Sequence, residues 1–145
     1  MGDPETADIV TPDEVLDFWF GGDLEVNYKT KWFPAGDKDG SAQKAADTEI
    51  TMRFGKTLGA ATSGALQAWA DGTPETAVAL VVVLDQFSRH VYRNAVDREA
   101  KLSVTDAIAV AVTNSALKKQ WHKKLTPAMH VFLLMPFRHT QMSVV

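Results

Sequence analysis

The sequence predicts an all-α protein of stacked antiparallel helix pairs, and three observations favour this class. Thr-Pro pairs at 11–12, 73–74 and 126–127 are typical helix starts, because Thr caps free N–H groups and Pro fits the first turn. Apolar residues recur at helical spacing over 46–61 and 104–112. Neither an Asn-Gly hairpin nor a convincing alternating apolar run is present. With 145 residues, the chain is expected to form one domain over 1–145.

The first expected helix covers residues 12–20. Thr11 and Glu14 have the spacing of a capping box, in which each side chain bonds the other residue's backbone N–H. Gly21-Gly22 is expected to end this helix by allowing a left-handed cap. Residues 23–40, rich in Asp, Gly and Lys, are expected to be a loop.

A second helix is expected from Ser41, with Asp39-Gly40-Ser41 as its cap and Ser63-Gly64 as its end. A brief helical turn should follow and close at Gly72. The expected core stripe of the long helix is Ala46, Ile50, Phe54, Leu58 and Ala61.

Residues 77–84 form an apolar run that fits either a buried strand or a buried helix. Val81–Val83 favours a strand on propensity. The Thr73-Pro74 start and the periodic continuation to Tyr92 favour a helix of about five turns, which is the interpretation we adopt. Its core face should carry Leu80, Leu84, Phe87 and Val91.

Two further helices are expected in the last third. The first is marked by Val104, Ile108 and Val112 and runs into a basic amphipathic stretch over 115–125, read as a solvated face. The second begins at Thr126-Pro127 and continues to Met135, where Pro136 should terminate or kink it.

Composition excludes several classes of protein. The absence of cysteine rules out a disulfide scaffold and a thiol nucleophile. Residues 1–10 are acidic, lack an apolar signal segment and are expected to be flexible. The longest apolar run, 77–84, is far too short to span a membrane, so a cytoplasmic protein without a membrane partner is expected.

Charge is distributed unevenly along the chain. Residues 1–50 carry twelve acidic and four basic side chains, whereas residues 51–145 carry six acidic and eleven basic ones. We expect the acidic first third to lie across the basic remainder. Because the overall charge is −3, nucleic acid is not an expected partner.

Motifs for cofactor or metal chemistry are weak. Gly55-Lys56-Thr57 lacks the earlier glycine of a phosphate-binding loop, and no serine-hydrolase elbow is present. The four histidines contain no i, i+4 pair, so no metal and no cofactor are expected.

The most informative segment is 84–93, in which Asp85, Arg89 and Arg93 follow one another at i, i+4 and i+8. One interpretation is an Asp–Arg pair that locks helix packing at the edge of a buried region. The alternative is an anion or carboxylate site built from Arg89, Arg93 and Arg53, with Asp85 orienting one of the arginines.

Several motifs together resemble the family called domain of unknown function 924. They are Val15–Phe20, Trp32-Phe33, Asp47 with Ile50 and Arg53-Phe54, Gly64 with Leu66 and Trp69, Leu84-Asp85-Gln86-Phe87-Ser88-Arg89, Tyr92-Arg93, and Met135-Pro136 with His139. The resemblance covers the chain from about residue 12 to its end. It implies a helical fold similar to tetratricopeptide-repeat proteins and no established activity.

The chain departs from the family pattern in two places. His139 is followed by Thr140-Gln141 where members usually have Ser-Glu, which puts any acid–base role of that Glu in doubt. Members continue for several helices beyond Val145, so the C-terminal part is expected to be missing. Phe132, Leu133, Phe137 and Val144 should then be under-covered.

Three functions follow as hypotheses. The first is a scaffold that binds a protein or peptide partner on its helical grooves. The second is an enzyme or small-ligand protein with an anion site, and the third is a fragment that forms a homodimer through its under-covered C-terminal face. The candidate ligand-binding residues are Arg53, Asp85, Gln86, Arg89, Arg93 and His139.

Overall fold

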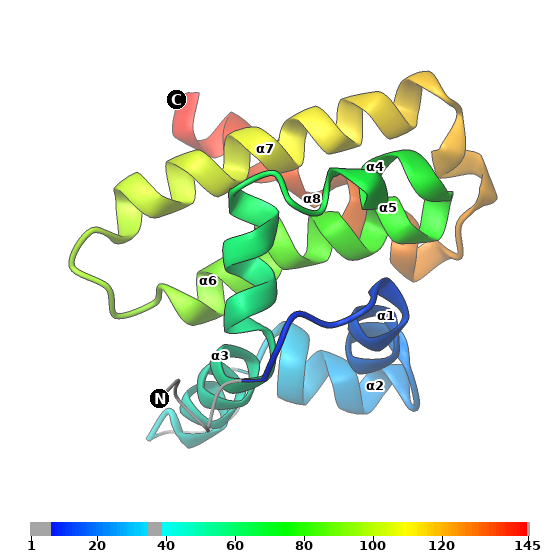
Figure 1. Cartoon of the computed structure of the whole chain (residues 1–145). Coiled ribbons are helices and arrows are strands. Elements are labelled where there is room, and N and C mark those ends of the chain that lie inside the picture. The colour runs from blue at the N-terminus through cyan, green and yellow to red at the C-terminus, as the bar shows by residue number, and fades with distance from the viewer. Residues whose placement is uncertain (1–6, 35–38, 145) are drawn as a thin grey trace.

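The computed structural model describes residues 7–34 and 39–144, and side chains are described as far as His139. Every element in these ranges is helical, which confirms the all-α prediction (Figure 1). The elements are α1 (Pro12–Phe20), α2 (Leu24–Asn27), η1 (Tyr28–Trp32), α3 (Ser41–Thr62), α4 (Gln67–Gly72), α5 (Pro74–Val81), η2 (Val82–Phe87), α6 (Ser88–Val91), α7 (Arg98–Lys118), η3 (Trp121–Lys124) and α8 (Pro127–Val144).

A continuous helical rod of α5, η2 and α6 runs through the middle of the molecule (Figure 1). It contacts α1, α3, α7 and α8, so it is covered on several sides. Leu80, Leu84 and Phe87 are buried as predicted, and so are the valines of the opposite side. The helical interpretation of 77–84 is therefore confirmed and the strand alternative is wrong. Thr73 and Thr76 start the rod with reciprocal side-chain-to-backbone bonds.

The helix expected from Ser41 is α3, which crosses the rod (Figure 1). All five residues of its predicted stripe are buried. It ends at Thr62, and Gly64 has a φ of +89°, a backbone conformation that side chains with a Cβ rarely adopt. The sequence thus located this helix and its end correctly.

The prediction of a loop over 23–40 is wrong for most of its described residues. Residues 24–32 form α2 and η1 instead, because the Asp23 carboxylate accepts from the N–H groups of Glu25 and Val26 and starts a helix. At the Gly21-Gly22 end of α1, Gly22 has the expected left-handed backbone, with a φ of +73°. Residues 35–38 of the expected loop lie outside the described ranges.

Pro136 was expected to terminate or kink the last helix, but α8 continues through it to Val144. One carbonyl in the turn before the proline, that of Leu133, accepts a hydrogen bond of 2.8 Å from Thr113 Oγ1 of α7. The proline removes the donor of the Phe132 carbonyl, so the bond from Thr113 ties this turn to α7 without replacing the missing helical bond. Termination at Met135 is therefore wrong.

Two packing expectations in the last third also need correction. Val104 is exposed, and the buried side of α7 carries Leu102 and Thr105 in its place. Phe132 and Leu133, expected to be under-covered, are buried against the rod and its neighbours.

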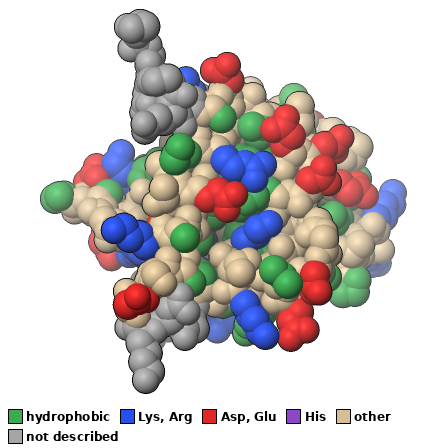
Figure 2. All heavy atoms as spheres, turned by 90° about the horizontal axis from the view of Figure 1, so that it is seen from below, with side chains coloured by type: hydrophobic (Ala, Val, Ile, Leu, Met, Phe, Trp, Pro, Cys, Tyr) green, Lys and Arg blue, Asp and Glu red, His purple; other side chains and the backbone are tan. Residues whose placement is uncertain are grey.

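The acidic first third does contact the basic remainder. Asp47 pairs with Arg93, and Asp8 lies 3.6 Å from Lys56. Residues 7–10 run beside α3, where the Ala7 N–H donates to the Met52 carbonyl. On the face seen in Figure 2, acidic and basic side chains are interspersed with hydrophobic ones. No helix in the described ranges has both the length and the apolar character that crossing a membrane requires.

Candidate functional site

A cavity of about 490 Å³ opens where α6, α7 and α8 approach η1, and we call it the arginine cavity. This volume suits a small-molecule ligand. Among the described residues its lining contains four arginines and two histidines and no carboxylate. The lining residues are Trp32, Phe33, Pro34, Gln43, Gln86, Arg89, His90, Arg93, Arg98, Met135, Arg138 and His139.

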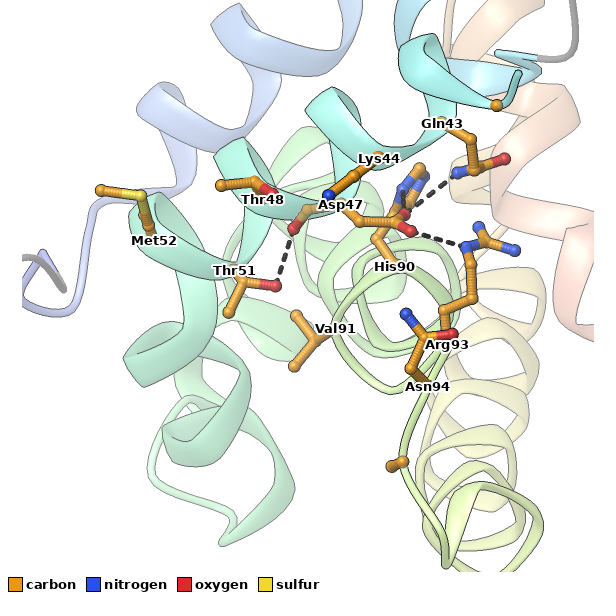
Figure 3. A pocket seen from close by; sticks show the side chains of 12 residues that line it. Gln43, Lys44, Asp47, Thr48, Thr51, Met52, His90, Val91, Arg93 and Asn94 are labelled. Atoms are coloured by element: carbon orange, nitrogen blue, oxygen red, sulfur yellow. Dashed lines mark hydrogen bonds and ion pairs between the residues drawn. The ribbon is translucent and has the colours of Figure 1, made fainter. Parts of the chain in front are cut away.

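Asp47 of α3 binds three side chains that line this cavity, and Figure 3 shows these contacts from a neighbouring cavity that Asp47 itself lines. Its carboxylate accepts from Arg93 Nε at 2.8 Å and from Gln43 Nε2 at 3.0 Å, and it lies 2.8 Å from His90 Nδ1. Burial of His90 lowers the pKa of its imidazole, and the bond to Asp47 opposes this only in part. Asp47 therefore fixes three side chains that line the cavity.

A second cavity of about 640 Å³, seen in Figure 3, lies next to the arginine cavity. Gln43, His90 and Arg93 line both cavities. The remaining lining of the second cavity is less basic, with Lys44 its other cationic side chain among those described.

A second carboxylate cluster lies behind the cavity and holds Arg89. The Arg89 Nη1 atom donates to Asp106 Oδ1 at 2.9 Å and to Asp85 Oδ1 at 3.2 Å, and also to the Asp85 carbonyl. Its Nη2 atom donates to Asp106 Oδ2 at 3.1 Å, which makes the Asp106 contact bidentate. Arg89 is therefore already neutralised by protein groups, as the packing interpretation of the Asp–Arg pair expects.

Asp85, Asp106 and His139 present ligand atoms that all lie within 4.8 Å of one another, an arrangement that a metal ion could use. In this structure the guanidinium of Arg89 bridges the two carboxylates at the position of a bridging cation. The guanidinium of Arg89 thus supplies the positive charge between the carboxylates of Asp85 and Asp106.

His139 of α8 connects this cluster to the cavity. Its Nδ1 atom lies 2.7 Å from Oδ1 of Asp85, which is fully buried, while its own side chain is 21% exposed. Gln86 donates to the other Asp85 oxygen at 2.8 Å. The ring therefore has one nitrogen bound to a carboxylate and its other edge toward the cavity.

Two cavity arginines are less constrained than Arg89 and Arg93. Arg138 forms no ion pair or hydrogen bond with any described residue. Arg98 lies 3.8 Å from Glu99, a carboxylate that is 98% exposed, and such pairs contribute little in water. These two guanidinium groups can bind an external anion without breaking a strong internal bond.

Two π-helical segments position residues of the cavity. One is η1, which contributes Trp32, and the other is η2, which contributes Gln86 and carries Asp85. The indole N–H of Trp32 donates to the Trp19 carbonyl at 2.9 Å and holds η1 against the end of α1. Turns of π-helix are rare in proteins, and those that occur are often found at functional sites. Two such segments at one cavity therefore support a functional role for it.

The structure brings together five of the six candidate site residues: Asp85, Gln86, Arg89, Arg93 and His139. Arg93 bonds Asp47 instead of the stripe to which the spacing assigned it. Arg53 lies apart, paired with Glu49 and placed over the rings of Phe18 and Phe54.

Sequence reasoning missed Asp47, His90, Arg98, Asp106 and Arg138 as site residues. Four of them sit on α3, α7 and α8 with no spacing relation to residues 84–93. His90 lies inside that segment, and its neighbours Arg89 and Arg93 were the available signal. No local pattern could have joined the others, since only the packing of separate helices brings them to one cavity.

The fold and this cavity define an all-helical protein with a cationic, aromatic-edged pocket. Residues 15–144 match the family described as "Bacterial protein of unknown function (DUF924)", and the chain belongs to that family. It is also similar to the solved "Structure of Protein of Unknown Function ATU0120 from Agrobacterium tumefaciens", with 28% identity and a TM-score of 0.69. That match covers 88% of this chain, and the chain spans 63% of the solved one. No curated protein matches the chain.

Proposed function

We propose that the protein binds a small organic anion, a carboxylate or a phosphate ester, in the arginine cavity. The observation that carries this proposal is Arg138, a guanidinium that lines the cavity and has no described partner. A guanidinium presents a planar fork of donors that matches carboxylate and phosphate oxygens. Arg98, with its single distant and exposed partner, supplies a second such group.

The apolar part of the lining indicates what the anion is attached to. Trp32, Phe33 and Met135 contribute aromatic and thioether surface to the same lining as the cationic groups. Pockets of this type combine an apolar surface with a few polar groups that orient the ligand. An anionic group on a planar or apolar body therefore fits better than a bare inorganic ion.

The peptide-binding scaffold expected from the sequence, with tetratricopeptide-like stacking, stays a prediction. The anion site has the stronger support because its charged groups, its volume and its lining are all defined by described residues. The C-terminal homodimer also stays a prediction.

Isothermal titration calorimetry tests the proposal with phenyl phosphate, benzoate and the uncharged phenol as probes. We expect at least one anion to bind and phenol to bind at least tenfold more weakly. Arg138→Gln should weaken binding of the anion at least tenfold, because the cavity loses a guanidinium that has no partner among the described residues. Arg53→Gln removes the same charge away from the cavity and should leave binding unchanged.

Two results would overturn the proposal. One is the failure of both anions to bind the wild-type protein at millimolar concentration. The other is equal weakening by the Arg138 and Arg53 substitutions, which would show that net charge acts and the cavity does not. Circular dichroism on each variant checks that the helical fold is retained.

A further inference from the structure

The Asp85–His139 pair has a geometry that anion binding alone does not require. Asp85 Oδ1 accepts from His139 Nδ1 at 2.7 Å, and the Asp85 side chain is completely buried. Since a carboxylate accepts only, Nδ1 must carry the hydrogen. The neutral ring then has an unprotonated Nε2 with a free electron pair.

The Nε2 atom is the part of the ring that a ligand can reach. Nδ1 is occupied by Asp85, yet the side chain remains 21% exposed and lines the arginine cavity. Nε2 has no hydrogen-bond partner among the described residues, and it is not among their buried unpaired atoms. It therefore belongs to the part of the ring that is not buried, in a side chain that lines the same cavity as Arg138.

Asp85 is itself held rigidly, which fixes the ring. Gln86 donates to its Oδ2 at 2.8 Å, and Arg89 donates to its Oδ1 at 3.2 Å. It sits in the π-helical segment η2 of the buried rod. A carboxylate oriented by two donors that orients an imidazole in turn is the arrangement by which proteins prepare a proton acceptor.

We infer that His139 is the acid–base residue of the arginine cavity and that Asp85 positions it. This inference rests on the proposed function, because the anion places its own proton beside Nε2. With a phosphate monoester, the O–H bond of the bound monoanion breaks, its proton forms a bond to Nε2, and the electron pair stays on the phosphate oxygen. The products are the phosphate dianion and an imidazolium that still donates Nδ1–H to Asp85.

Charges of both signs surround the two products. The dianion faces Arg138 and Arg98, and the imidazolium faces Asp85, with Asp106 also within reach. Arg89, which lies between the two carboxylates, opposes the imidazolium, and so do Arg93, Arg98 and Arg138 of the same cavity. The second pKa of a phosphate monoester is about 6, so a bound ester can still carry the transferable proton near neutral pH.

Nitrogen-15 NMR of the labelled full chain tests the inference with phenyl phosphate as the probe. His139 signals are assigned by their loss in His139→Gln. We expect the free protein at pH 7.5 to show Nδ1–H with an unprotonated Nε2. Adding phenyl phosphate at pH 6.5 should move Nε2 toward the protonated position, while the phosphorus signal moves toward that of the dianion.

Two variants separate an acid–base role from a purely structural one. Asp85→Asn should shift His139 toward the Nε2–H tautomer, because the amide can donate to Nδ1. His130→Gln removes a histidine that lies outside the cavity and should leave both the His139 signals and their response unchanged. A structural role alone would predict no response of Nε2 to the ligand.

The outcomes distinguish this inference from the proposed function. If phenyl phosphate binds by calorimetry and the His139 signals do not respond, the acid–base role is refuted and the anion site stands. If the free protein shows the Nε2–H tautomer, the role is refuted as well. If neither phenyl phosphate nor benzoate binds, the proposed function and this inference fall together.

Discussion

Replacing Asp47 by Asn should destabilise the fold more than any loss of a surface charge. The Asp47 carboxylate is 15% exposed and accepts from Gln43 and Arg93 while also contacting His90. In Asp47→Asn the amide oxygen can still accept from Gln43 at the Oδ1 position. The amide nitrogen then takes the Oδ2 position and faces another donor, Arg93 Nε. One charge-assisted hydrogen bond is lost and one donor is left unpaired.

The expected cost follows from these contacts. A hydrogen bond to a charged group contributes about 1.5–3 kcal/mol, and the value here lies toward the lower end because Arg93 is 36% exposed. We expect Asp47→Asn to lower the free energy of unfolding by about 2 kcal/mol. For a chain of this size that corresponds to a fall in Tm of roughly 4–8 °C.

Urea denaturation followed by circular dichroism measures this change, with the slope m expected to stay constant. Asp71→Asn is the matched control, since it removes a carboxylate that is 64% exposed and pairs with Lys119 at 3.4 Å. It should cost less than about 1 kcal/mol. Equal costs for the two variants would refute the reasoning that Asp47 holds the wall of the cavity.

Three further predictions concern other parts of the fold. Burial lowers the pKa of His90 below its ordinary 6.5, so the unfolded chain binds more protons than the folded one. The free energy of unfolding should therefore fall as pH drops below about 6.5. The slope is at most about 1.4 kcal/mol per pH unit. His90→Gln should make that slope shallower in denaturation curves between pH 5 and 7.5, and an unchanged slope would exclude His90 as its source. Thr113→Val should cost about 1–3 kcal/mol in urea denaturation because the buried Leu133 carbonyl loses its donor, whereas Thr51→Val, at an exposed site, should cost less than about 1 kcal/mol. Gly21→Ala should destabilise by about 1–3 kcal/mol, since a Cβ there would lie 2.3 Å from the Asp17 carbonyl oxygen; Gly59→Ala meets nothing within 4 Å, and a similar loss at both would contradict the steric argument.

The starts of the helices were predictable because their causes are local. Thr11 and Thr73 each bond a backbone N–H three residues ahead, a relation that spacing alone defines. The stripe of α3 was predictable for the same reason, since apolar residues four apart must share one face of a helix. The loop expected over 23–40 failed because a single Asp23 cap outweighed the loop-like composition around it.

The candidate site also contains local contacts, which the sequence predicts, and long-range contacts, which it does not. The contact between Asp85 and Arg89 lies within one helical turn and could be read from the sequence. The contacts of Asp47 with Arg93 and of Asp85 with His139 join residues 46 and 54 positions apart. Neither follows from periodicity, because each depends on the angle at which two helices pack.

The sequence by itself therefore determined an all-helical chain, most helix starts and the presence of an unusual Asp–Arg segment, because these depend on interactions across one or two turns. Only the tertiary structure decided what that segment does. It neutralised Arg89 between two carboxylates, left Arg53 apart, and placed Arg138 and His139 from α8 in the cavity. The physical reason is that the partners of a charged side chain decide whether it is neutralised or free to bind a ligand. Here most of those partners come from other helices.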